Sequence, residues 1–131
     1  MEIHMFTPIV PSGSAKPIAP YVNGARADNT IYVSGTLAID QQGGVVAPGD
    51  AAGQTRYILD QIKSVIEAGG GNLTDIAYNM IFISDVKHYA EMNRIYAEYF
   101  THPPARFCVV SQLVREEFLV EIASIAHVQS V

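Results

Sequence analysis

The fold is decided by residues 50–85, which read DAAGQTRYILDQIKSVIEAGGGNLTDIAYNMIFISD. Apolar side chains in the first half recur at helical spacing, namely Ile58, Leu59, Ile62, Val65 and Ile66. The glycines at positions 69–71 supply a C-terminal stop, so the pattern predicts a helix between Asp50 and Gly69. Residues 76–84 are short, rich in β-formers and almost uncharged, which predicts a buried strand.

After this stretch, the sequence predicts a second helix and two strands. Asp85 is a candidate N-cap. Over residues 86–100 one helical face collects Tyr89, Met92, Asn93, Tyr96 and Phe100. The run HPP at residues 102–104 ends this helix. Strands are expected at residues 106–111 and 119–128, joined by a charged loop at residues 114–117.

Before residue 50, the chain is less regular. Residues 3–21 are rich in Pro, Gly and Ser, which predicts extended chain broken by turns that wraps an edge of the fold. Residues 30–34 (TIYVS) are β-branched and aromatic and predict a strand. The turn-forming residues 41–44 then indicate a hairpin, whose return strand begins at Val45 and Val46.

The predicted order is therefore strands, helix, strand, helix, strands, within a single domain of residues 1–131. Two amphipathic helices need an apolar surface, which a mixed sheet provides when both helices pack on one of its faces. We therefore expect an α+β fold. The opposite sheet face would stay uncovered, and self-association into a closed ring would cover it.

Composition and charge narrow the class of protein. Hydrophobic residues make up 49% and charged residues 16% of the chain, as in an ordinary globular protein. The net charge of −5 and the dispersed basic residues argue against a nucleic-acid partner, which usually needs a basic patch. A lone cysteine, Cys108, and the lack of a signal-peptide pattern or a long apolar run predict a cytoplasmic protein with no membrane partner.

Arg106 opens an otherwise apolar strand, RFCVV, where a guanidinium must find an anion or face water. Cys108 lies two residues further and shares its direction, while Phe107 points to the other face. Two interpretations stay open: a strand-end arginine paired with an internal carboxylate, or an anchor for an anionic ligand.

Glu121 lies inside the apolar segment LVEIASIA, where burial should be deep. Burying a carboxylate is costly, so Glu121 is either paired with a cation or held with a raised pKa. The second state suits a general base or acid. The competing interpretation is a purely structural ion pair between Arg106 and Glu121 on neighbouring strands.

Other polar residues give weaker signals. Asn93, on the apolar face of the second helix, is either an internal tie or a ligand contact. Ser34 and Gly35 end a strand where backbone amides could approach a ligand, although a simple turn has the same sequence. Cys108 has no histidine motif to activate it, which favours small buried filler over a nucleophile. The four histidines lack metal-ligand spacing, so no metal site is expected.

Five segments together resemble the Rid (YjgF-like) family along nearly the whole chain: PIAPYVNG, YVSGTLAID, MNRIYAEYF, PARFCVV and VEIASIA. The thirteen positions from Cys108 to Glu121 also agree with that family's spacing between its cysteine and its acidic residue. The SGT and PARFC variants are similar to the RutC-type branch, the 3-aminoacrylate deaminases of pyrimidine breakdown. Thr36, Phe107 and Ala123 depart from residues common in the family, which bears on substrate choice more than on reaction type.

The resemblance implies a chorismate-mutase-like subunit, assembled as a homotrimer with sites between subunits. It implies that Arg106 clamps the substrate carboxylate and that Glu121 positions or activates water. The pocket would be lined by Tyr21, Ser34, Gly35, Asn93 and Cys108. The implied reaction is the hydrolysis of enamine or imine acids without a cofactor, either 3-aminoacrylate to malonate semialdehyde and ammonia or 2-aminoacrylate. The alternative is a non-catalytic trimer that binds small carboxylates or another protein.

Overall fold

The computed structural model describes residues 3–15 and 17–130, and the described strands form one six-stranded sheet. The strands are β1 (Thr7–Ile9), β2 (Gly24–Ala27), β3 (Thr30–Thr36), β4 (Ile76–Ile83), β5 (Ala105–Val110) and β6 (Val120–His127). Their order across the sheet is β1-β2-β3-β6-β4-β5. All neighbouring pairs are antiparallel except β4 and β5, which are parallel, so the sheet is mixed as predicted.

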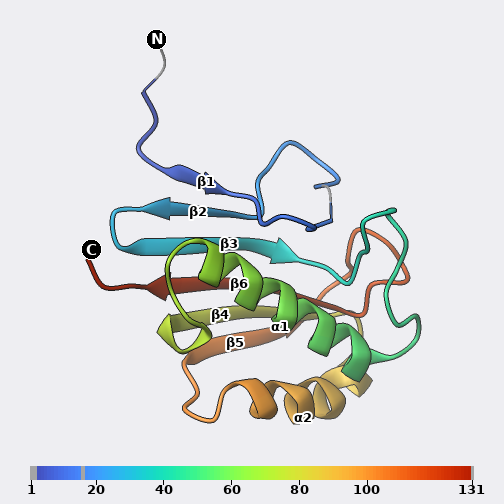
Figure 1. The fold of residues 1–131 in the computed structure, drawn as a ribbon. Coiled ribbons are helices and arrows are strands. Elements are labelled where there is room, and N and C mark those ends of the chain that lie inside the picture. Colours follow the sequence, from blue (N-terminus) through green and yellow to red (C-terminus); the bar gives the residue numbers. More distant parts are fainter. Residues whose placement is uncertain (1–2, 16, 131) are drawn as a thin grey trace.

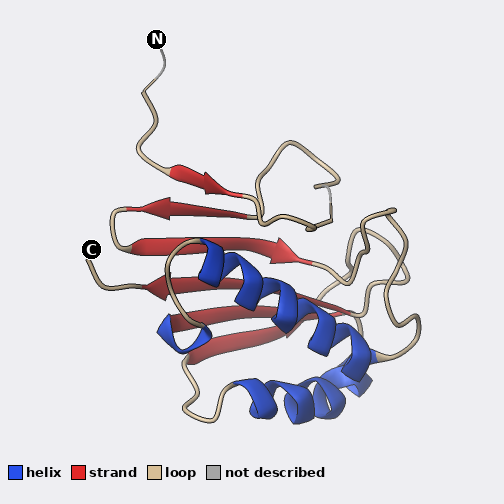
Figure 2. Ribbon diagram, in the orientation of Figure 1, coloured by secondary structure: helices blue, strands red, loops and turns tan. Residues whose placement is uncertain are grey.

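Two helices, α1 (Ala51–Ala68) and α2 (Tyr89–Tyr99), cover the same face of this sheet (Figure 1). Short 3-10 turns, η1 (Leu73–Asp75) and η2 (Val86–His88), precede β4 and α2. Figure 2 shows the resulting two layers, with the helices on one side of the strands. The expected α+β fold is therefore confirmed. None of the described helices has the length and hydropathy needed to cross a membrane.

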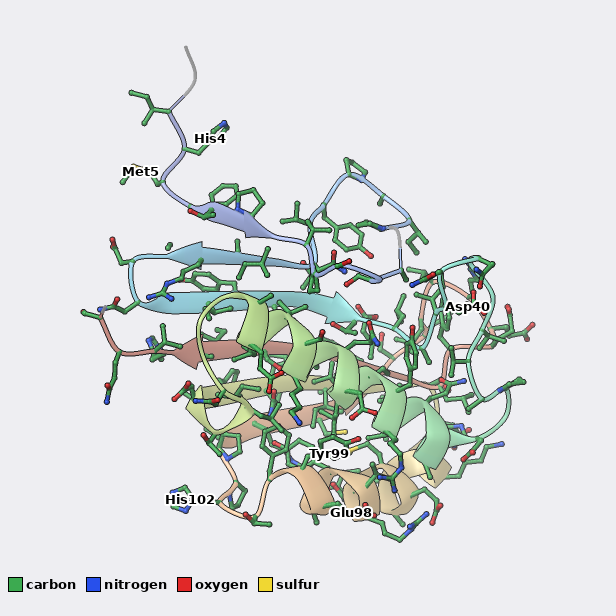
Figure 3. The ribbon with its side chains drawn as sticks, viewed as in Figure 1. His4, Met5, Asp40, Glu98, Tyr99 and His102 are labelled. Carbon is green, nitrogen blue, oxygen red and sulfur yellow. The ribbon has the colours of Figure 1, made fainter. Side chains whose placement is uncertain are left out.

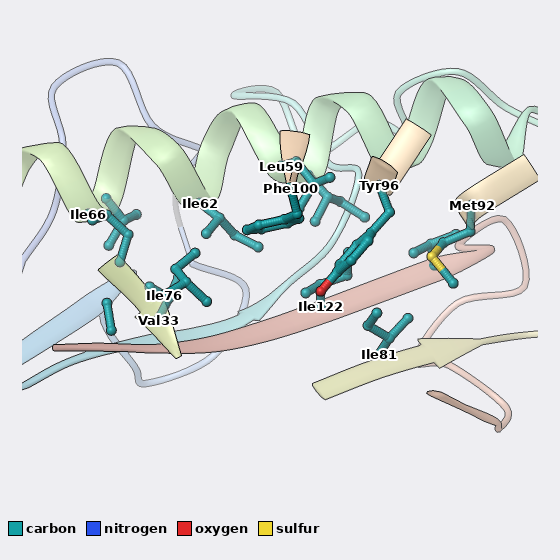
Figure 4. Close-up of a cluster of buried hydrophobic side chains, with 14 of the residues drawn as sticks. Val33, Leu59, Ile62, Ile66, Ile76, Ile81, Met92, Tyr96, Phe100 and Ile122 are labelled. Carbon is teal, nitrogen blue, oxygen red and sulfur yellow. The ribbon is translucent and has the colours of Figure 1, made fainter. Parts of the chain in front are cut away.

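The first helix, α1, begins and ends where the sequence predicts. The Asp50 side chain caps its first turn by accepting a hydrogen bond from the backbone amide of Gly53. At the other end, Nη1 of Arg26 donates to the carbonyl of Gly69 at 2.7 Å, which places a positive charge at the helix C-terminus. The apolar stripe of α1 is buried against the sheet and α2, at Ile58, Leu59, Ile62, Val65 and Ile66 (Figure 4).

The second helical segment starts differently from the prediction. The Asp85 side chain accepts a hydrogen bond from the amide of Lys87, and so caps the 3-10 turn η2 rather than the α-helix itself. The α-helical geometry begins only at Tyr89. Of the predicted face, Met92 and Tyr96 lie in the core with Phe100 packed beside them (Figure 4), whereas Tyr89 is 44% exposed and Asn93 is only partly buried.

One expectation for the N-terminal half is wrong, and one strand there was not predicted. The predicted return strand at Val45 and Val46 is reduced to a single bridge between Ile39 and Val45. Both edges of β3 are already occupied, by β2 and β6, so a return strand has no free partner. The true hairpin partner is β2, whose GARA sequence has low β propensity and gives no strand signal. Asp28, with φ of 51°, makes the turn between the two strands.

The proline-rich segment of residues 3–21 behaves as expected for extended chain at an edge. Its strand β1 pairs with β2 and closes one edge of the sheet, while β5 forms the other edge (Figure 1). The described residues of this segment beyond β1, 10–15 and 17–21, run irregularly towards the end of β3, where the hollow described below lies. The segment therefore contributes residues to that hollow, which the prediction of strands alone does not indicate.

Candidate functional site

The two charged residues of the predicted site lie on opposite faces of the sheet. Arg106 on β5 stands opposite Asn79 of β4 and contacts α2, so its side chain lies on the helix-covered face. Glu121 on β6 stands opposite Phe82, whose ring packs edge-on against Phe107 at 5.6 Å between centroids. Because Phe107 alternates with Arg106, this places Glu121 on the uncovered face.

The structural ion pair between Arg106 and Glu121, one of the interpretations of the sequence, is therefore wrong. The strands β5 and β6 are not neighbours, because β4 lies between them. Within one subunit, a sheet separates the two side chains. Arg106 and Glu121 therefore do not neutralise each other within one chain.

The Arg106 guanidinium is held by side chains of α2. Its Nη2 donates to Oδ1 of Asn93 at 2.7 Å and to the hydroxyl of Tyr89 at 3.3 Å. Its Cζ lies 4.7 Å from the centroid of the Tyr96 ring, a cation–π distance. Nη1 lies 4.0 Å from Sδ of Met92. These described partners are all neutral, so the contacts orient the positive charge without neutralising it.

Cys108 lies beside Arg106 on the helix-covered face, as the spacing of two residues predicts. Its side chain is half-buried and packs against the core. Burial raises the pKa of the Cys108 thiol, and the nearby Arg106 offsets only part of that rise. A thiol with a raised pKa is protonated at neutral pH, which does not favour a nucleophilic thiolate.

Glu121 belongs to a second group of predicted residues, which line one open hollow of about 360 Å³. The hollow is lined by Tyr21, Ser34, Gly35 and Glu121, together with Ile18, Ala19, Leu37 and Val114. Burial raises the pKa of the Glu121 carboxyl above its usual range. A raised carboxyl pKa is typical of a carboxyl group that acts as a general acid or base.

A β-bulge shapes this hollow. Val33 pairs with Ser124 and Thr36 pairs with Ile122, so the two residues between them on β3 oppose the single residue between them on β6. The two bulged residues are Ser34 and Gly35, the pair that the sequence analysis noted at the strand end. The Ser34 hydroxyl donates to the carbonyl of Val22, which ties the bulge to the proline-rich segment.

Gly35 makes room for the Glu121 carboxylate. A Cβ at position 35 would overlap Oε2 of Glu121 and lie 3.3 Å from its Cδ. The missing side chain is thus required by a close approach rather than by an unusual backbone angle. Gly35 therefore leaves the space that the carboxylate of Glu121, the candidate acid or base, occupies.

The structure thus brings Arg106, Asn93 and Cys108 together on one face, and Tyr21, Ser34, Gly35 and Glu121 together in the hollow. The sequence did not identify Tyr89 and Tyr96 as partners of Arg106. Helical periodicity had nevertheless placed both tyrosines on the inward face of α2. In residues 3–15 and 17–130, no three His, Cys, Asp or Glu side chains are grouped as a metal site would require.

Comparison with known sequences and structures identifies the family to which the chain belongs. A sequence model of the family described as Endoribonuclease L-PSP matches residues 12–128. The chain belongs to this family, the YjgF/Rid family. The match spans nearly the whole chain and confirms the resemblance found in the sequence segments.

Several solved structures of the YjgF/Rid family are similar. The E. coli YjgF gene product is 31% identical, with 94% of this chain and 99% of that one covered and a TM-score of 0.85. YyfA from Yersinia pestis, described as a Rid protein of unknown function, is 31% identical with the same coverage and a TM-score of 0.86. E. coli TdcF, crystallised with bound serine, is 27% identical over 94% of this chain and 99% of its own, with a TM-score of 0.86.

These similarities confirm the chorismate-mutase-like α+β fold. The relatives carry different functional descriptions, from endoribonuclease to Rid protein, so the family name alone does not fix a reaction. The resemblance to the aminoacrylate deaminase branch stays a prediction.

Proposed function

We propose that the protein is a deaminase that hydrolyses reactive enamine or imine acids in a site shared between two copies of the chain. Membership of the YjgF/Rid family supports small-molecule deamination or imine hydrolysis at the family level. The observation that favours a shared site is the placement of Arg106 and Glu121 on opposite faces of one sheet. Neither residue meets an opposite charge across that sheet.

The exposed surface of the subunit supports the shared site. β5 is an edge strand, so Arg106 and Cys108 lie at the border of the subunit. On the uncovered face, Tyr32 of β3 is 49% exposed, and Val109 of β5, which pairs with Phe82, is 44% exposed. An apolar face of this kind favours association. A closed ring in which β5 of one copy meets the hollow of the next would bring Arg106 to Glu121, and the predicted homotrimer is such a ring.

In this site, Arg106 would hold the substrate carboxylate. A guanidinium has five N–H donors, and the hydrogen bonds to Asn93 and Tyr89 use the two donors of Nη2. The remaining donors can make the paired, charge-assisted hydrogen bonds that carboxylates accept. Binding at this point fixes the reacting carbon relative to the hollow, where Glu121 stands in the neighbouring copy.

Hydrolysis would then proceed by addition of water. An enamine acid such as 3-aminoacrylate tautomerises to its imine, which moves a proton from nitrogen to carbon. The Glu121 carboxylate accepts a proton from water as the water oxygen bonds to the C=N carbon, and the resulting carbinolamine takes that proton back on nitrogen. Loss of ammonia leaves the carbonyl acid, malonate semialdehyde for 3-aminoacrylate. No step calls for a cofactor.

The experiment that tests this proposal combines turnover with mixing of subunits. We expect wild-type protein to accelerate ammonia release from 3-aminoacrylate or 2-aminoacrylate generated in situ, and Arg106→Ala and Glu121→Ala each to lose most of that acceleration. Equal amounts of the two variants, co-expressed so that subunits mix, would regain about one quarter of the wild-type activity, since a quarter of shared sites draw both intact residues. No recovery would contradict a shared site, and no wild-type acceleration would contradict the deaminase.

A second candidate is a non-catalytic trimer that binds small carboxylates. The neutral surroundings of Arg106 favour it, because they fit carboxylate binding whether or not turnover follows. The presence of serine in the TdcF structure is also consistent with small-carboxylate binding in a relative. Carboxylate binding that depends on Arg106, without turnover that depends on Glu121, would favour this candidate. Binding to RNA that weakens steeply with salt would instead contradict the prediction of no nucleic-acid partner.

A further inference from the structure

We propose that Ser124, Asn79 and Tyr96 form a buried chain of hydrogen bonds that positions Arg106 for carboxylate binding. This inference rests on the proposed function, because it assigns residues that act on the anchor of that site. The three residues are positioning residues, since none of them faces the substrate.

The chain crosses from the sheet to the helix. Oγ of Ser124 on β6 donates to Oδ1 of Asn79 on β4 at 2.6 Å, and Nδ2 of Asn79 donates to the hydroxyl of Tyr96 on α2 at 3.0 Å. All three side chains are buried, with relative exposures of 1%, 0% and 6%. Figure 4 shows the Tyr96 ring reaching from α2 towards the sheet, with its hydroxyl at the sheet end.

The Tyr96 ring is the link to the site. Its centroid lies 4.7 Å from Cζ of Arg106, and cations are attracted to the face of such a ring. Asn93, three residues earlier on the same helix, accepts a hydrogen bond from Nη2 at 2.7 Å. Asn93 and Tyr96 are thus two of the α2 side chains that place the guanidinium, and the Asn79 amide fixes the depth and tilt of Tyr96.

A simpler explanation is that the chain only satisfies polar groups in the core. Asn79 lies among apolar side chains such as Ile81 and Ile122, where an unpaired amide would be costly. That explanation predicts an effect on stability alone. A positioning role also predicts weaker carboxylate binding in a protein whose stability has been restored, and this difference allows a test.

The test compares three variants in the full-length, assembled protein. Tyr96→Phe keeps the ring and removes the hydroxyl. The triple variant Ser124→Ala, Asn79→Leu, Tyr96→Phe removes the whole chain and leaves none of its polar groups unpaired, so it limits the loss of stability. The matched control is Tyr99→Phe, on the same helix, where the lost hydroxyl contacts Asp60 at 2.6 Å instead of the chain (Figure 3).

Pyruvate, the stable keto acid that 2-aminoacrylate hydrolysis yields, serves as the probe in calorimetric titration. We expect its Kd to rise about fivefold in Tyr96→Phe and in the triple variant, the loss typical of a weakened cation–π contact. The Tyr99→Phe control should bind as wild type does. In turnover, KM should rise while kcat stays within twofold, and the NMR resonances of the Arg106 side chain should shift because the ring above it has moved.

Each outcome has a distinct meaning. If wild type neither binds pyruvate nor accelerates hydrolysis of either aminoacrylate, or if it binds pyruvate equally well after Arg106→Ala, the proposed function fails and this inference fails with it. If wild type binds through Arg106 but the triple variant binds with the same Kd, only the positioning role is overturned. Loss of affinity in the Tyr99→Phe control to the same extent would also overturn it, since the effect would then follow from general loosening of α2.

Discussion

Replacing Gly35 by alanine gives a sharp test of the site, because the change is one methyl group at a known contact. A Cβ at this position would overlap Oε2 of Glu121, while Cδ at 3.3 Å is a tight neighbour that would have to shift only slightly. The conflict is thus with one carboxylate oxygen at the end of a flexible side chain. We expect the backbone to stay in place and the carboxylate to move by about 1 Å, the distance needed to restore an ordinary contact.

A displacement of this size has a large effect on a reacting group. A misplacement of 1 Å can reduce the rate about 100-fold, so we expect kcat/KM of Gly35→Ala to fall by about that factor. The assay is ammonia release from 3-aminoacrylate and 2-aminoacrylate generated in situ, with Tm measured alongside. Pyruvate affinity should change less than kcat/KM, because the Arg106 that holds the carboxylate comes from the neighbouring copy and keeps its contacts with Asn93 and Tyr89.

The decisive comparison is made in the Glu121→Ala background. There the methyl group of Gly35→Ala meets no carboxylate, so the double variant should be no less active than Glu121→Ala alone. Our reasoning would be refuted if Gly35→Ala kept wild-type activity. It would equally be refuted if the substitution cost the same factor with and without Glu121.

Three further predictions follow from the same geometry. Arg106→Ala should weaken pyruvate binding and lower kcat/KM about 100-fold, as expected for loss of a charge-assisted contact, whereas Cys108→Ala, which lacks a thiolate role, should lower kcat/KM less than tenfold in the same assay. Because burial raises the pKa of Glu121, the folded protein holds this proton more tightly than the unfolded chain, so its effect on stability becomes unfavourable as pH rises above the ordinary glutamate range. Glu121→Gln should therefore raise Tm at neutral pH and leave it unchanged about one unit below the ordinary glutamate pKa, and a higher wild-type Tm at neutral pH would contradict this. Asp50→Ala removes the cap of α1 and should lower the free energy of unfolding by about 1 kcal/mol in urea titrations, with unchanged stability as the contrary result.

The parts of the fold that the sequence predicts are those with strong local signals. α1 is delimited by Asp50 and Gly69, and the stripe between them has a clear helical period. β2 is not predictable in this way, because its GARA sequence becomes a strand only through pairing with β3. The false return strand at Val45 shows the same limit, since its exclusion depends on β6 arriving from the far end of the chain to occupy the second edge of β3.

For the candidate site, too, some features are predictable from the sequence and others depend on strand pairing. That Arg106 and Cys108 share a face follows from their spacing of two residues. That Glu121 lies on the other face does not follow from spacing, because it depends on the register of β4 between β5 and β6. The bulge at Ser34 and Gly35 is likewise a property of the β3–β6 pairing, and only that pairing shows why a glycine is needed beside Glu121.

The separation of Arg106 and Glu121 by the sheet has a consequence for how activity depends on concentration. A shared site exists only while copies are associated, so specific activity should decline when the protein is diluted below the dissociation constant of the ring. By mass action, a ligand that bridges two copies must strengthen their association by the same factor by which association strengthens its binding. Substrate would then stabilise the assembly, and its concentration would determine the fraction of subunits that are associated and able to catalyse the reaction.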